Sequence, residues 1–95
     1  MNKKETYQEE LQARLDHWKV EIDQLGAKAD EAHAEARLRF REDIEKLRAH
    51  QEKAEAKMKE LRHAQGEAWQ DLKSGIEAAW EELGNTVHKA RKRFS

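Results

Sequence analysis

The chain has 95 residues, of which 41% are charged and 37% hydrophobic, with a net charge of −1 and a mean hydropathy of −1.21. So little apolar material excludes a large core, and the length limits the chain to one small domain. The absence of cysteine excludes a disulfide framework, a thiolate metal site and a cysteine nucleophile. No apolar run exceeds three residues and the first residues are polar, so we expect a cytoplasmic protein without a transmembrane helix.

The N-terminal part predicts a helix that begins near residue 5. Thr6 and Glu9 have the spacing of a capping box, in which each side chain covers a free backbone N–H of the first turn. Proline is absent, and 14 alanines with many Glu, Lys, Arg and Gln residues favour helix throughout the chain.

An apolar stripe continues from this start almost to the end of the chain. Between Tyr7 and Phe94 it makes 24 steps over 87 residues, a mean spacing of about 3.6 that is the period of an α-helix. The predicted assembly seam takes most of its residues from this stripe and adds two tryptophans beside it: Leu15, Trp18, Ile22, Leu25, Ala29, Ala32, Ala36, Phe40, Ile44, Leu47, Met58, Leu61, Trp69, Leu72, Ile76, Trp80 and Leu83.

Four glycines are the only breaks in this pattern. Gly26 and Gly75 lie inside strong apolar periodicity, so we expect both to stay helical. Gly66 lies where the stripe weakens and is the best candidate for a reversal. Gly84, followed by an asparagine, predicts a helix end. The sequence therefore predicts one long helix over about 5–64, a shorter helix over about 67–83 that folds back, and a tail over 84–95.

These elements predict an all-α antiparallel coiled-coil or bundle, with a dimer favoured. A helix over 5–64 would be about 90 Å long at 1.5 Å per residue, and its midpoint falls among Ala29, Ala32 and Ala36. Small side chains there would let two chains cross closely. Each end would then be a layer of three helices: 40–64 and 67–83 of one chain and 7–25 of its partner.

The tail carries four cations and no acid: Lys89, Arg91, Lys92 and Arg93. These residues are the candidate contact for an anionic surface, a membrane first and nucleic acid second. The alternative is that the cations only complement the negative end of a helix dipole and keep the chain soluble; this second interpretation is favoured.

Catalytic and metal signatures are weak. Asp30 to His33 spells a helicase metal box, but the chain lacks a phosphate-binding loop. Glu60 and His63 have a spacing that di-iron bundles use, yet neither lies on the stripe. The five histidines are dispersed and no Ser/His/Asp arrangement is available. We therefore expect no enzyme, no cofactor, no metal site and no small-molecule substrate.

Several segments, from Tyr7-Gln8-Glu9-Glu10-Leu11 to Ala79-Trp80-Glu81-Glu82-Leu83, resemble one family. The most distinctive is Ala68-Trp69-Gln70-Asp71-Leu72-Lys73-Ser74-Gly75. Together they are similar to short bacterial proteins described as coiled-coil domain-containing or stress-response proteins. The resemblance implies a helical, stress-associated, non-enzymatic protein and no site residues.

The sequence leaves three functional hypotheses open. The first is a self-associating structural or interaction protein. The second is a peripheral binder of anionic surfaces through the tail. The third is a small adaptor that offers the helix over 67–83 to a protein partner, which requires Trp69 and Trp80 to be exposed in the free chain.

Overall fold

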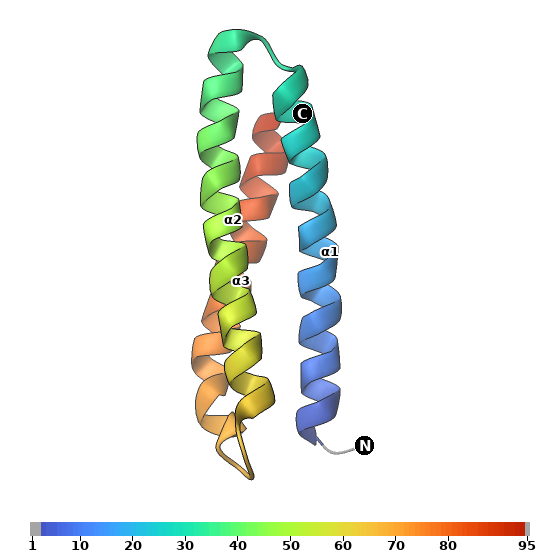
Figure 1. The fold of residues 1–95 in the computed structure, drawn as a ribbon, viewed down its shortest axis with the longest axis vertical. Helices are drawn as coiled ribbons and strands as arrows, with labels where there is room; N and C mark the ends of the chain where they lie inside the picture. The colour runs from blue at the N-terminus through green and yellow to red at the C-terminus, as the bar shows by residue number, and fades with distance from the viewer. Residues whose placement is uncertain (1–2, 95) are drawn as a thin grey trace.

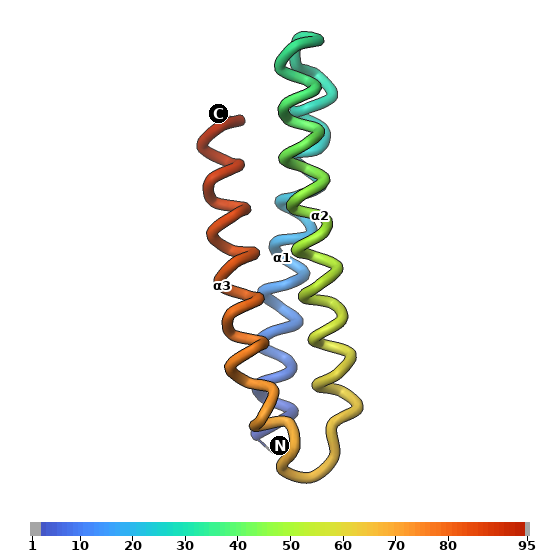
Figure 2. Tube along the Cα trace, turned by 90° about the vertical axis from the view of Figure 1, so that its left-hand side faces the viewer, coloured from blue at the N-terminus to red at the C-terminus, as the bar shows by residue number. Residues whose placement is uncertain are grey.

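The computed structural model describes residues 3–94 as three helices that run up, down and up (Figure 1). They are α1 (Lys3–Glu31), α2 (Ala34–His63) and α3 (Trp69–Phe94). The bundle measures 51 × 19 × 18 Å, and α1 and α3 run parallel to each other with α2 antiparallel to both (Figure 2). The prediction of an all-α helical bundle is confirmed.

The long helix expected over 5–64 is instead two helices. The chain reverses at Ala32 and His33, and His33 has an extended backbone with φ −60° and ψ 155°. No glycine or proline marks this turn, so local propensity did not predict it. Burial explains it, because in a chain on its own a helix about 90 Å long would leave its stripe in water, whereas folding back pairs the two halves of the stripe.

The second reversal lies at the predicted place. The C-cap residue of α2, Ala64, donates its N–H to the carbonyl of Leu61 at 3.2 Å. Gly66 follows with φ +58°, the left-handed conformation that glycine adopts without steric cost. Lys4 helps to close this end, since its Nζ donates to the Ala64 carbonyl at 2.5 Å.

The third helix is longer than expected, and the helix end predicted at Gly84 is wrong. α3 begins at Trp69 and continues through the glycine to Phe94, so the described part of the predicted tail is helical. Val87 and Ala90 are buried and extend the stripe, and the ring of Phe94 lies 4.1 Å from that of Phe40. These contacts outweigh the weak local signal for termination.

The core lies along the common axis of the three helices and uses the predicted stripe. Among the described residues every buried side chain is apolar, and none is polar or charged. Twelve of the predicted seam residues are buried, and five are half-buried: Trp18, Ala32, Ala36, Phe40 and Leu72. The seam expected between chains is therefore filled within one chain.

Candidate interaction surface: the groove between α1 and α3

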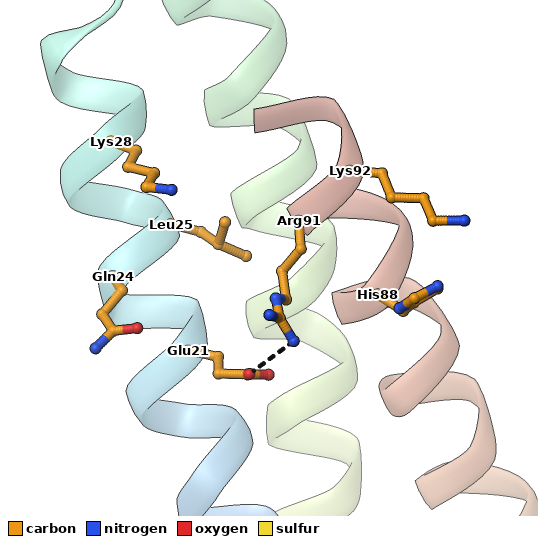
Figure 3. Close-up of a pocket in the computed structure, with 7 residues that line it drawn as sticks. All are labelled: Glu21, Gln24, Leu25, Lys28, His88, Arg91 and Lys92. Carbon is orange, nitrogen blue, oxygen red and sulfur yellow. Dashed lines mark hydrogen bonds and ion pairs between the residues drawn. The ribbon is translucent and has the colours of Figure 1, made fainter. Parts of the chain in front are cut away.

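Two hollows of the described surface follow the line where α1 and α3 lie side by side. An upper hollow is lined by Glu21, Gln24, Leu25, Lys28, His88, Arg91 and Lys92 (Figure 3). A lower hollow is lined by Tyr7, Leu11, Arg14, Trp18, Glu77, Trp80, Glu81, Gly84 and Asn85. We call the two together the α1–α3 groove. The sequence predicts that residues 7–25 lie beside 67–83, although with 7–25 from a partner chain, and it does not identify a groove between them.

A close contact between Trp18 and Gly84 shapes the lower hollow. A Cβ atom added to Gly84 would lie 3.0 Å from Cζ2 of the Trp18 indole, so the glycine makes room for the ring. On the outer side, the guanidinium of Arg14 lies 5.1 Å from the centre of the indole, a cation–π arrangement. Gly84 is thus a packing residue rather than a helix end.

The other two tryptophans belong to the core. Trp69 is 6% exposed and Trp80 is 1% exposed. The indole N–H of Trp80 donates to the backbone carbonyl of Leu11 at 3.2 Å, which fixes the position of α3 along α1 while satisfying a buried donor. The exposure that the adaptor hypothesis required of these two indoles is therefore not present.

The four cations of the predicted anionic-surface contact lie on different sides of α3. Arg91 reaches across the groove to Glu21 at 3.2 Å (Figure 3), and Arg93 pairs with Asp43 of α2 at 3.0 Å. Lys92 points away from α1 (Figure 3), whereas Lys89 lines a hollow between α2 and α3.

These two ion pairs connect the end of α3 to both other helices. The side chains of Glu21 and Asp43 are each only 16% exposed, although their arginine partners remain open to solvent. Two of the four cations are thus partly neutralised by acids that lie outside the tail, which sequence reasoning could not anticipate. The arrangement weakens the concentrated positive patch on which the anionic-surface hypothesis depended.

An aromatic cluster closes the lower end of the groove. The rings of Tyr7 and Trp69 are 5.7 Å apart, and the ammonium of Lys73 lies 5.3 Å and 4.8 Å from their respective centres. Burial, followed by the charge of Glu77, raises the pKa of the Tyr7 hydroxyl. A raised pKa keeps the phenol neutral, so it does not provide a phenolate base or nucleophile near neutral pH.

The remaining shifted pKa values belong to one ion pair between α1 and α2. Lys19 Nζ lies 2.8 Å from an oxygen of Glu55. Their hydrogen bond and charge attraction raise the pKa of Lys19 and lower that of Glu55. Both side chains are about 40% exposed, and both groups are stabilised in the charged forms they already have at neutral pH, which indicates a structural role.

The described residues contain no group of three or more His, Cys, Asp and Glu side chains that could hold a metal ion. The two sequence patterns considered for metal binding are dispersed on the surface, since Asp30, His33, Glu60 and His63 are all exposed. None of the helices in the described range has the length and apolar character needed to cross a bilayer.

No family model, curated protein or solved structure matches this chain. The resemblance to bacterial coiled-coil stress proteins therefore stays a prediction, and the function of the chain has to be inferred from the geometry of the bundle.

Proposed function

We propose that this protein is a non-enzymatic, self-associating helical bundle with a structural or interaction role. The observation that carries the proposal is the use of the apolar stripe. The described core contains only apolar side chains, and the groove and ion pairs tie helices together. The predicted stripe thus packs helix against helix, and a bundle of this kind offers the same apolar faces to a second copy of itself. The stress-related part of the role rests on the family resemblance alone.

The end of the bundle near Ala32 supports the self-associating part of the proposal. The α1–α2 turn projects beyond the last residues of α3 (Figures 1 and 2). Ala32 and Ala36 are only half-buried there, beyond Phe40, which is the stripe residue that the end of α3 still contacts through Phe94. A second copy of the chain would cover these two alanines, which is favourable in proportion to the apolar area removed from water.

Molar mass in solution tests the proposal directly. Light scattering on the full chain over a wide concentration range should show a mass that rises above the 11.2 kDa of one chain. The alanine-to-polar variant Ala36→Gln should lower the associated fraction, whereas Ala56→Gln, on an exposed part of α2, is the matched control. A constant monomer mass at every concentration would contradict self-association.

A further inference from the structure

We propose that two copies of this chain associate by exchanging α1, with the turn at Ala32 and His33 acting as the hinge. In the exchanged dimer α1 and α2 form one continuous helix, and α1 of each chain packs on α2 and α3 of the other. This inference rests on the proposed self-association and specifies both its partner, a second copy, and its geometry.

The turn is the first line of support, because His33 does not cap α2 and the side-chain hydrogen bond across the turn runs from Arg37 to the Ala32 carbonyl. His33 departs from helical geometry through ψ, which is 155°, while its φ of −60° is already helical. Its side chain makes no capping hydrogen bond to α2. The residues on either side, Ala32 and Ala34, are alanines, the strongest helix formers. Ala32 and His33 are the two residues outside helical geometry, so a change of backbone angles within these two residues would straighten the chain into conformations that its sequence prefers.

The phase of the stripe is the second line of support. Ala29, Ala32, Ala36 and Phe40 keep steps of three or four residues across the turn. A helical hairpin does not require regular spacing across its turn, because the apolar residues of the second helix can start at any distance from those of the first. A continuous helix does require it, because only then do both halves present one uninterrupted face. The small side chains fall where two such helices would cross and approach most closely.

The third line of support is that the contacts between helices are the same in the closed monomer and in the exchanged dimer. The hydrogen bond from Trp80 to Leu11 and the ion pairs Arg91–Glu21 and Lys19–Glu55 each join α1 to α2 or α3. All of them can form equally between two chains, as expected when identical elements are exchanged. A contact local to the turn, from Arg37 Nη2 to the Ala32 carbonyl at 3.2 Å, would have to change.

Concentration then decides between the two forms. The closed monomer loses no translational freedom, whereas the dimer does. The fraction of chains in the exchanged dimer therefore increases with protein concentration and with any substitution that favours a straight hinge. Exchange requires release of α1 from the core, so the two forms should interconvert slowly and equilibrate best when the chain is refolded at high concentration.

Two substitutions at His33 should shift the equilibrium between the closed monomer and the exchanged dimer in opposite directions. His33→Ala removes nothing that caps α2 and favours the straight helix. His33→Pro fits the observed φ of −60° but disrupts a continuous helix, because proline lacks the N–H donor and clashes with the preceding turn. After refolding at high concentration, the dimer fraction should decrease from His33→Ala to wild type to His33→Pro, with a dimer dissociation constant for the proline variant weaker by ~100-fold or more.

Crosslinking identifies which α1 lies in the groove. The chain has no cysteine, and Glu21 and Arg91 face each other across the groove. In the double variant Glu21→Cys/Arg91→Cys, a short bis-maleimide joins positions within one chain in the monomer. In the exchanged dimer it joins two chains. The isolated dimer fraction should therefore migrate as a covalent dimer on a denaturing gel, and the same variant carrying His33→Pro is the control.

The outcomes separate this inference from the proposed self-association. A dimer that yields only intrachain crosslinks overturns the exchange of α1 and leaves self-association standing. Such a dimer, if held by outer faces, should be sensitive to Leu38→Glu or Val20→Glu, the exposed large hydrophobic residues, and insensitive to His33→Pro. A monomer in both wild type and His33→Ala overturns both proposals.

Discussion

Gly84 offers a sharp test of the groove. Gly75 and Gly84 both lie within α3, but their surroundings differ. A Cβ at Gly75 would find its nearest neighbour, Lys57 Nζ, at 3.9 Å, which is an ordinary contact with a flexible side chain. At Gly84 it would lie 3.0 Å from Cζ2 of Trp18. The same substitution to alanine should therefore give different results at the two positions.

The expected change in the free energy of unfolding depends on two contributions, the gain in helix propensity and the cost of overpacking. Replacing glycine by alanine inside a helix stabilises it by about 0.5–1 kcal/mol, and this gain should appear in full for Gly75→Ala. Overpacking costs ~1–3 kcal/mol, and since Trp18 is half-buried and can tilt outward, we expect the lower end of that range at Gly84. Gly84→Ala should thus be about 1 kcal/mol less favourable than Gly75→Ala, which corresponds to ~4–8 °C in melting temperature.

Thermal and urea unfolding, followed by circular dichroism, would measure both variants and the cycle with Trp18→Ala. Removal of the indole should restore the gain from Gly84→Ala to that of Gly75→Ala, giving a coupling free energy of about 1 kcal/mol between positions 18 and 84. If Gly84→Ala stabilises the protein equally with and without the indole, the close packing of α1 on α3 at this point is refuted.

Three further variants test the core, the second turn and the ion pair. Leu83→Ala, at a fully buried position, should lower the free energy of unfolding by ~2–5 kcal/mol, whereas Leu38→Ala, 66% exposed, should change it by less than ~0.5 kcal/mol in the same urea titrations. Gly66→Ala forces alanine to φ +58° and should cost ~1–2 kcal/mol; an unchanged urea midpoint would rule out this turn. The Glu55 carboxyl has a pKa lowered below 4.5, so its pairing with Lys19 stabilises the fold above that pH and is lost as the pH falls through the lowered pKa. Lys19→Ala should accordingly cost less than ~1 kcal/mol at pH 7, given the solvent exposure of both groups, and the cost should decrease as the pH falls through the lowered pKa; a cost that does not change with pH would show that the charge is not the cause.

The sequence was sufficient to predict that the chain is helical and which residues form most of the core, but not where the helices begin and end. The period of about 3.6 residues sets which side chains share a face, and a single buried face per helix leaves little choice about which residues are covered. Gly66 was predictable for a local reason, because its left-handed conformation suits a residue without a side chain.

The turn at His33 was not predictable on local grounds. Neighbouring alanines favour continuation of the helix, and what opposes it is the burial gained when two distant halves of the stripe meet. The α1–α3 groove is similarly nonlocal, since Trp18 and Gly84 are 66 positions apart in the sequence. A glycine inside strong apolar periodicity was the available signal for a close approach, but at Gly84 it was interpreted as a helix end.

The same packing of three helices can be formed by one chain or by two. The predicted dimer and the observed single-chain bundle contain the same three-helix layer, formed by residues 7–25, 40–64 and the beginning of α3. The side chains of this layer are apolar and specify which faces meet, whereas in the proposed exchange the turn at Ala32 and His33 would determine whether α1 belongs to the same chain. The proposed exchange makes that choice depend on the free energy of this turn and on protein concentration. Substitutions at His33 should therefore change the number of chains per bundle while leaving the helix content and the burial of Trp80 unchanged.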